Sequence, residues 1–210
     1  MHKQTTAELL AIVGGLSKPS KMPGYAYGIP AQACKVGSLL RTVKGSTCSK
    51  CYALKGMYVF PVVRAAQSRR MESLSDPVWI LAMTELISRR TKSVPFFRWH
   101  DSGDLQSLEH LSKIVEIAKN LPEVSFWLPT RETATVKEFL ANIGIFPTNL
   151  CVRISAPMIG RTPEKIAGTV GSSVEDTSGF SCPAPKQGNA CGDCRACWNP
   201  KVENVSYHAH

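Results

Sequence analysis

Residues 94–104 read VPFFRWHDSGD, an aromatic run that ends abruptly in small and charged residues. This pattern is typical of a buried strand that stops at a polar turn. It recurs further along the chain, where Val124–Leu128 (VSFWL) leads into PTRE and Leu150–Ile154 (LCVRI) leads into SAP. The three runs predict three strands, each followed by a polar turn.

Helical segments separate these runs. Residues 107–119 and 133–142 carry apolar side chains at helical intervals, and residues 77–90 do so before the first run. Strands that alternate with helices in this way form parallel sheets with crossover helices. The stretch 94–156 therefore predicts a β-α-β-α-β unit in an α/β fold.

The chain has 210 residues, of which 43% are hydrophobic, and this is enough for one domain with a core. We expect a single domain, 1–210, made of an N-terminal loop and helix region (1–60), a βα core (61–167) and a cysteine-rich tail (168–210). Residues 16–33 are rich in Pro, Gly and Tyr and predict a loop. The tail has little intrinsic secondary structure, so a metal would have to hold it.

Seven of the eight cysteines fall into two tight groups. The first has the spacing C-x13-C-x2-C, and the second has the spacing C-x8-C-x2-C-x2-C and begins beside Pro183. Structural zinc ligands usually come as separated pairs, whereas successive C-x2-C steps near a proline resemble the bacterial ferredoxin run. We therefore expect at least one [4Fe–4S] cluster, and the spacing leaves open whether there are one or two. The expected metal ligands are Cys34, Cys48, Cys51, Cys182, Cys191, Cys194 and Cys197.

The composition limits which classes of partner and which cellular compartment we expect for this chain. A formal charge of +9 suits a nucleic-acid partner, but the basic residues are scattered without a block of five or more, which does not favour one. No run of about 18 apolar residues occurs, so we expect no membrane span. The start of the chain predicts no secretory signal, and this favours a reducing cytosol, where clustered cysteines bind metal instead of forming disulfides. Cys151, in mid-strand, is expected to be a buried thiol.

Polar residues follow each of the three predicted strands, and parallel α/β sheets bind ligands at that end. Gly103 would let a ligand approach the backbone, and Asp104 would accept a hydrogen bond from an amine or a hydroxyl. The alternative is that the turn only caps the next helix and that the arginines pair with neighbouring acids. The expected cofactor pocket comprises Gly103, Asp104, Thr130, Arg131, Arg153 and Ser155.

Four segments resemble those of one family. They are TCSKCYA (47–53), RWHDSGD (98–104), FWLPT (126–130) and CGDCRACW (191–198), and they resemble the phage-encoded proteins of the gene product 88 family. The resemblance extends from about Cys34 to Trp198. It implies a bacteriophage origin and expression in a host cytoplasm.

A wider resemblance follows from three cysteines ahead of βα units, a Gly-Asp turn and a cysteine-rich tail. These features are similar to the radical S-adenosylmethionine architecture. That resemblance implies an open or truncated (β/α) barrel of about five or six parallel strands, with an irregular tail. It also implies a cubane cluster on Cys34, Cys48 and Cys51, and S-adenosylmethionine beside Gly103 and Asp104. The gap of 13 residues before Cys48 is longer than is usual in that architecture.

Three hypotheses about function follow. The first is an iron–sulfur protein with a radical-SAM-like barrel, which acts as an enzyme on a small molecule or exchanges electrons with a host or phage donor. The second is a zinc-stabilised nucleic-acid-binding protein, in which the two C-x2-C pairs Cys48/Cys51 and Cys194/Cys197 share one zinc. The third is a structural or host-interaction protein whose metal only holds the tail. The sequence presents no recognisable catalytic dyad, so it leaves open whether the protein is an enzyme.

Overall fold

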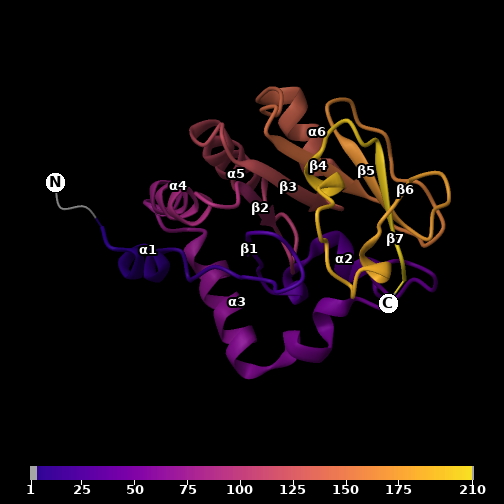
Figure 1. Ribbon diagram of the computed structural model, residues 1–210, viewed down its shortest axis with the longest axis horizontal. Coiled ribbons are helices and arrows are strands. Elements are labelled where there is room, and N and C mark those ends of the chain that lie inside the picture. The colour runs from indigo at the N-terminus through magenta and orange to yellow at the C-terminus, as the bar shows by residue number, and fades with distance from the viewer. Residues whose placement is uncertain (1–3, 210) are drawn as a thin grey trace.

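The computed structural model describes residues 4–209, and its strands form one open sheet in which every strand pairing is parallel. The order is β1-β2-β3-β4-β5-β7-β6, so β1 and β6 are the edges (Figure 1). The α/β fold with parallel strands is therefore confirmed. The strands are β1 (Tyr25–Tyr27), β2 (Phe96–Trp99), β3 (Ser125–Thr130), β4 (Leu150–Ser155), β5 (Val170–Val174), β6 (Phe180–Ser181) and β7 (Asn204–Tyr207).

Helices connect consecutive strands in the first part of the sheet. Figure 1 shows α4, α5 and α6 following one another along the sheet, because parallel strands in sequential order place their crossover helices on one face. The helices are α1 (Thr6–Ile12), α2 (Lys35–Leu40), α3 (Pro61–Ser73), α4 (Trp79–Arg90), α5 (Leu108–Asn120) and α6 (Thr133–Asn142). Short 3-10 turns are η1 (Ala31–Ala33), η2 (Tyr52–Leu54), η3 (Gly56–Val59), η4 (Ala184–Lys186) and η5 (Ala196–Trp198).

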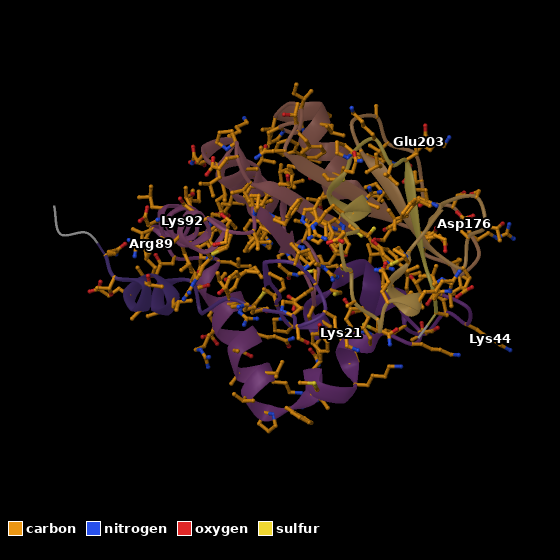
Figure 2. The ribbon with its side chains drawn as sticks, in the orientation of Figure 1. Lys21, Lys44, Arg89, Lys92, Asp176 and Glu203 are labelled. Atoms are coloured by element: carbon orange, nitrogen blue, oxygen red, sulfur yellow. The ribbon has the colours of Figure 1, made fainter. Side chains whose placement is uncertain are left out.

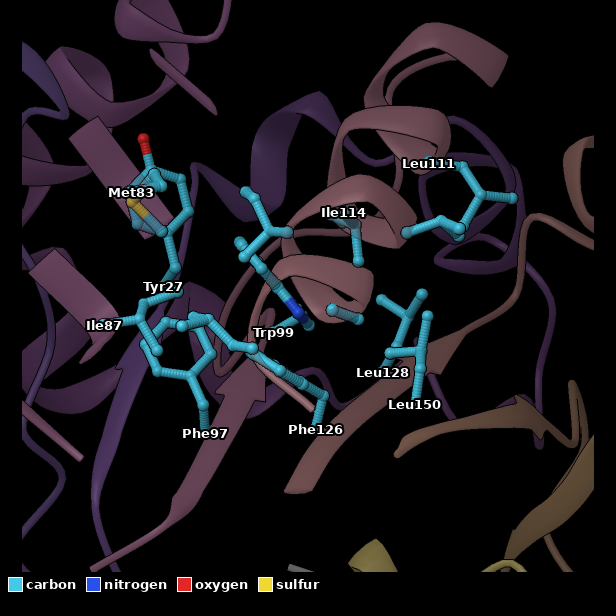
Figure 3. Close-up of a cluster of buried hydrophobic side chains, with 14 of the residues drawn as sticks. Tyr27, Met83, Ile87, Phe97, Trp99, Leu111, Ile114, Phe126, Leu128 and Leu150 are labelled. Atoms are coloured by element: carbon cyan, nitrogen blue, oxygen red, sulfur yellow. The ribbon is translucent and has the colours of Figure 1, made fainter. Parts of the chain in front are cut away.

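The hydrophobic core lies between the sheet and these helices, with aromatic side chains of β2 and β3 at its centre (Figure 3). Phe97, Trp99 and Phe126 are fully buried, and the rings of Phe97 and Trp99 meet edge to face at 5.0 Å. Burial of each such side chain contributes about 1.5–3 kcal/mol. Because side chains alternate along a strand, Arg98 points to the opposite face of the sheet. That face carries the candidate site.

The sheet has seven strands, so the expectation of about five or six is wrong. β1 lies inside the segment 16–33, which we expected to be a loop, and β5 and β7 lie inside the tail. Their sequences (YAY, VGSSV and NVSY) are short and lack a clear apolar alternation. They become strands because the neighbouring strand supplies hydrogen-bond partners, which local propensity does not register. Between β6 and β7 the described chain has two 3-10 turns and no other regular element.

Two surface properties bear on function. None of the helices within residues 4–209 combines the length and apolarity that crossing a bilayer requires. Among the basic residues that Figure 2 labels, Lys44 and Lys92 lie at opposite ends of the view and Lys21 lies between them.

Candidate functional site

A cavity of about 390 Å³ opens at the carboxyl ends of the strands. Its walls include the turn after β2 (residues 100–104), Arg131 after β3, Ser155 in β4 and residues 172–174 of β5. The volume is within the ~300–1,000 Å³ that is usual for small-molecule sites. The cavity thus joins the ends of four neighbouring strands.

The segment 31–58 covers this cavity and carries the first cysteine group. Thr47 N donates to the carbonyl of Pro157 at 2.9 Å, just beyond β4. Tyr52 Oη donates to the carbonyl of Asp101 at 2.7 Å, just beyond β2. Because the segment is tied to two strand ends, its cysteines are held over the cavity.

The first group consists of Cys34, Cys48 and Cys51, and all three line the cavity. Burial, and then the charges of Asp104, Cys51 and Cys48, raise the pKa of Cys34 to about 12. The charges of the other two cysteines therefore act on the Cys34 thiol. Gly37 leaves room for two of them: a Cβ there would lie 3.0 Å from Cys34 Cβ and 3.6 Å from Cys48 Sγ. A larger residue at position 37 would press on both cysteines.

The second group consists of Cys182, Cys191, Cys194 and Cys197. Burial and then the charges of Cys182 and Cys194 raise the pKa of Cys191. Burial also raises the pKa of Cys197, and the charge of Cys182 adds a smaller contribution in the same direction. Cys197 Sγ lies 3.1 Å from the hydroxyl of Tyr207 in β7. In contrast to the first group, none of these four described residues lines the cavity.

Arg153 fastens the second group to the sheet. It is fully buried in β4, and its guanidinium donates five hydrogen bonds of 2.7–3.0 Å to main-chain carbonyls. This arrangement satisfies a buried charge with five backbone dipoles. The accepting carbonyls belong to Gly171, Ala196, Cys197, Asn199 and Val202.

The cysteine side chains are grouped but not arranged as a ligand shell. Within the described part of the chain, no three His, Cys, Asp or Glu side chains stand so that they could hold a metal ion. Ligation therefore requires the cysteine side chains to rotate about their Cα–Cβ bonds. The remaining cysteine, Cys151, is buried in β4.

The turn after β2 is braced by Asp104. Its Oδ1 accepts from Thr130 Oγ1 at 2.6 Å and from Leu105 N at 2.8 Å, and its Oδ2 accepts from Arg131 N at 2.9 Å. Burial raises the pKa of Asp104 to about 6, although these hydrogen bonds act in the opposite direction. Gly103 has φ 82°, and a Cβ there would lie 2.4 Å from the Ile29 side chain. The turn therefore needs glycine at this position for its own packing.

Two buried histidines, His100 and His110, lie at the same turn. His100 has φ 55°, a strained conformation that is uncommon outside glycine and is often found at functional sites. It lines the cavity, and neither of its ring nitrogens has a partner within residues 4–209. Burial, and then His110 and Arg98, hold the pKa of His100 well below its usual value. The ring of His100 is therefore neutral near pH 7.

Arg98 is the cavity residue that the sequence analysis did not single out. Its guanidinium lies over the ring of Trp127, 4.3 Å from the ring centre, and its Nη2 lies 3.3 Å from Tyr52 Oη. The signal was available in the run FFRW, because a charged residue between two buried aromatics must face the other side of the strand.

The structure brings most of the expected cofactor residues together. Gly103, Asp104, Arg131 and Ser155 line the cavity, and Ser155 Oγ lies 3.1 Å from Ser172 Oγ. Thr130 and Arg153 lie outside its lining, since Thr130 is bound to Asp104 and Arg153 to the tail. The alternative that the arginines form ion pairs is not seen for Arg131 or Arg153 within the described residues.

A family model described as Gene product 88 matches residues 2–200 of the chain. No curated protein and no solved structure matches it at a significant level.

Proposed function

The chain belongs to the gene product 88 family of phage proteins, and we propose that it is an iron–sulfur protein with two separate [4Fe–4S] clusters. One would be held by Cys34, Cys48 and Cys51 and face the cavity. The other would be held by Cys182, Cys191, Cys194 and Cys197 and stabilise the tail. We further propose that the protein works in the host cytoplasm, as its phage family suggests.

The observation that carries this proposal is the unequal position of the two groups. The three cysteines of the first group line the cavity, whereas the four of the second group do not. A cubane has four irons, so three thiolates leave one iron for a further ligand and four thiolates leave none. The first site would thus meet small molecules, and the second would be structural or would carry electrons.

The residues present fit such clusters by their chemistry. Thiolates are the ligands that iron–sulfur clusters use, and all seven cysteines of the two groups are free thiols. Gly37 keeps the space between Cys34 and Cys48 free of a side chain. Burial raises the pKa of Cys48, and the charge of the nearby Arg131 acts in the opposite direction. Main-chain hydrogen bonds and Arg153 already hold the segments that carry both groups.

A cluster with an open iron supplies one-electron chemistry or binds a small ligand at that iron when it is present. The chain's own contribution would be to enclose the ligand within about 390 Å³ and to present Arg98, His100 and Arg131 to it. S-adenosylmethionine, which the radical-SAM resemblance implies, is one ligand to test at this site. Its amine would have to compete for Asp104 with Thr130 and the amide of Arg131.

The test is to purify the protein anaerobically and to quantify iron, sulfide and zinc together with the visible spectrum. We expect a broad visible absorption and about eight irons per chain, which is the content of two cubanes. The paired variants C34A/C48A and C191A/C194A should each lose about half of the iron, and Cys151→Ala, a buried cysteine outside both groups, should lose none. A protein that contains neither iron nor sulfide, and gains none on anaerobic reconstitution, would refute the proposal.

Zinc is the alternative metal, and the number of cysteines in the second group suits it. Four thiolates suit the tetrahedral geometry of a structural zinc site. A colourless protein with stoichiometric zinc would support a zinc-stabilised structural or nucleic-acid-binding protein. DNA binding that weakens steeply with salt would then separate these two roles.

A further inference from the structure

We propose that the cavity binds a small organic anion, whose carboxylate or phosphate is held by Arg98 and whose flat, unsaturated part packs against Trp127, Tyr58 and Tyr207. The inference deepens the proposed function by naming a class of substrate, and it rests on that function for its chemistry. Binding itself can be measured whether or not a metal is present.

Arg98 has the geometry of an anion-binding group. Its guanidinium lies 4.3 Å above the centre of the Trp127 ring, which covers one face of the group. The N–H donors lie in the guanidinium plane, so stacking leaves its edge able to form paired hydrogen bonds with an oxyanion. Its contacts to Met22 Sδ (3.9 Å) and Tyr52 Oη (3.3 Å) are long, and its Nε has no partner among residues 4–209.

Positive charge exceeds negative charge around the cavity. Four of the lining residues are Lys or Arg, and two are Asp. Asp104 already accepts three hydrogen bonds, and Asp101 Oδ1 lies against the backbone of Gly28, where a Cβ would come within 2.2 Å of it. Asp104 is thus engaged, whereas Asp101 Oδ1 faces the wall without a partner among the described residues and its charge acts on Arg98. The four cations still outnumber the two carboxylates, so the field in the cavity favours an anion. The four cations are Arg41, Lys50, Arg98 and Arg131.

The apolar part of the lining includes four Tyr and Trp rings. Tyr207 stacks on Trp127 with ring centres 6.4 Å apart and an angle of 28° between the planes, and Tyr58 and Tyr52 meet edge to face at 5.5 Å. Aromatic walls of this kind pack best against another planar group. The three tyrosines and Trp127 all line the cavity.

Buried polar atoms without partners gather at the same place. Within residues 4–209 they include the nitrogens Arg98 Nε, Trp127 Nε1, Arg131 Nε and both of His100, and the carboxylate oxygen Asp101 Oδ1, and all five residues line the cavity. Buried polar groups are nearly always hydrogen-bonded in native proteins. An oxyanion would satisfy the donors among them, namely Arg98 Nε, Trp127 Nε1, Arg131 Nε and the protonated nitrogen of the neutral His100 ring.

The experiment is calorimetric titration with benzoate, phenyl phosphate and the neutral isostere benzamide, on both the as-purified and the iron-reconstituted protein. We expect saturable binding of at least one anion, and weaker binding of benzamide. Preference for benzoate or for phenyl phosphate would tell a carboxylate ligand from a phosphate ligand. Arg98→Met should weaken the binding of the preferred anion by about 10-fold to 100-fold, because a charge-assisted hydrogen bond is lost.

Arg90→Met is the matched control. Arg90 also stacks on an aromatic ring, with its guanidinium 5.5 Å from the centre of Tyr25, and its Nε also has no partner among the described residues, but it does not line the cavity. Binding that is equal for benzoate and benzamide, or equal in wild type and a folded Arg98→Met, would overturn the inference. So would the failure of both anions to bind. If Arg98→Met does not fold, the comparison of the anions with benzamide in the wild-type protein still decides it.

The two proposals fail separately. Anion binding to a protein that takes up no iron would leave this inference standing and refute the iron–sulfur function. Two clusters in a protein that binds neither anion would do the reverse.

Discussion

Arg153 Nε donates a 2.9 Å hydrogen bond to the carbonyl of Cys197, and so joins the middle of the sheet to the last cysteine of the chain. The same guanidinium donates four more bonds to main-chain carbonyls, all of them within the tail (168–210). Arg153, which the sequence placed in the expected cofactor pocket, thus acts first as the anchor of the loop that carries the second cysteine group.

Arg153→Met should be strongly destabilising. It leaves five carbonyls without their donor, and each unpaired buried group costs about 1–3 kcal/mol, so we expect a loss of at least about 3 kcal/mol in the free energy of unfolding. Denaturant unfolding measures this loss. Arg195→Met is the control, because Arg195 donates to only two tail carbonyls and is partly exposed. An equal loss in both variants would contradict the anchoring role.

Gly37→Ala should impair the first metal site without unfolding the protein. The added methyl would press on Cys34 Cβ at 3.0 Å and would fill the space beside Cys48 Sγ, whereas replacing glycine in helix α2 gains about 0.5–1 kcal/mol. We therefore expect nearly unchanged stability but about half the iron of the wild-type protein. Leu39→Ala, at an exposed position of the same helix, should keep all of it. Iron that stays at the wild-type level in Gly37→Ala would show that the spacing at position 37 does not matter.

Asp104 should make the folded protein less stable as the pH rises. Burial raises its pKa from 3.8 to about 6, so the folded state binds the proton more tightly than the unfolded state. The associated stability is fully present below about pH 4 and is lost as the pH passes through about 6. Between these limits the loss amounts to about 3 kcal/mol. In Asp104→Asn this component should disappear from the pH profile of unfolding, measured over the pH range where the metal content is constant.

Asp176→Asn is the control for this titration, because Asp176 lies outside the cavity and hydrogen bonds lower its pKa. Direct observation of the Asp104 carboxyl carbon by NMR gives a second reading. A midpoint near the ordinary value of an aspartate would contradict the predicted direction.

Removal of the metal should loosen the chain between β6 and β7. Only two short 3-10 turns occur there, so the metal is expected to supply much of its order. Trypsin should then cut after Lys186, Arg195 or Lys201 faster in chelator-treated protein than in protein with its full metal content. Cleavage after Lys92, an exposed site next to α4, should not change. Equal rates at all sites would mean that Arg153 and the sheet hold the tail without metal.

The sequence predicted the central part of the fold well. β2, β3 and β4 have apolar runs whose burial dominates every competing preference, and the helices between them have clear periodicity. β1, β5 and β7 could not be predicted in this way. Their few small and polar residues carry no pattern, and they are strands because adjacent backbone is available for pairing.

The candidate site was predicted in part. Spacing identified the seven cysteines, but it could not reveal that three line a cavity and four do not, because that depends on how the tail returns to the sheet. The hydrogen bond from Thr130 to Asp104 could not be predicted from the sequence either, because it joins residues 26 positions apart. Arg98 was missed although its place in FFRW marks it as facing away from the core.

The strand order also constrains the sequence of events during synthesis. β7 lies between β5 and β6, although it is made after both. While the ribosome is still adding residues 182–203, β6 has no neighbour to pair with, and β5 exposes the edge that β7 will later occupy. The nascent chain therefore carries an unfinished sheet edge until its last strand emerges, and this is the interval in which it is most open to misassociation.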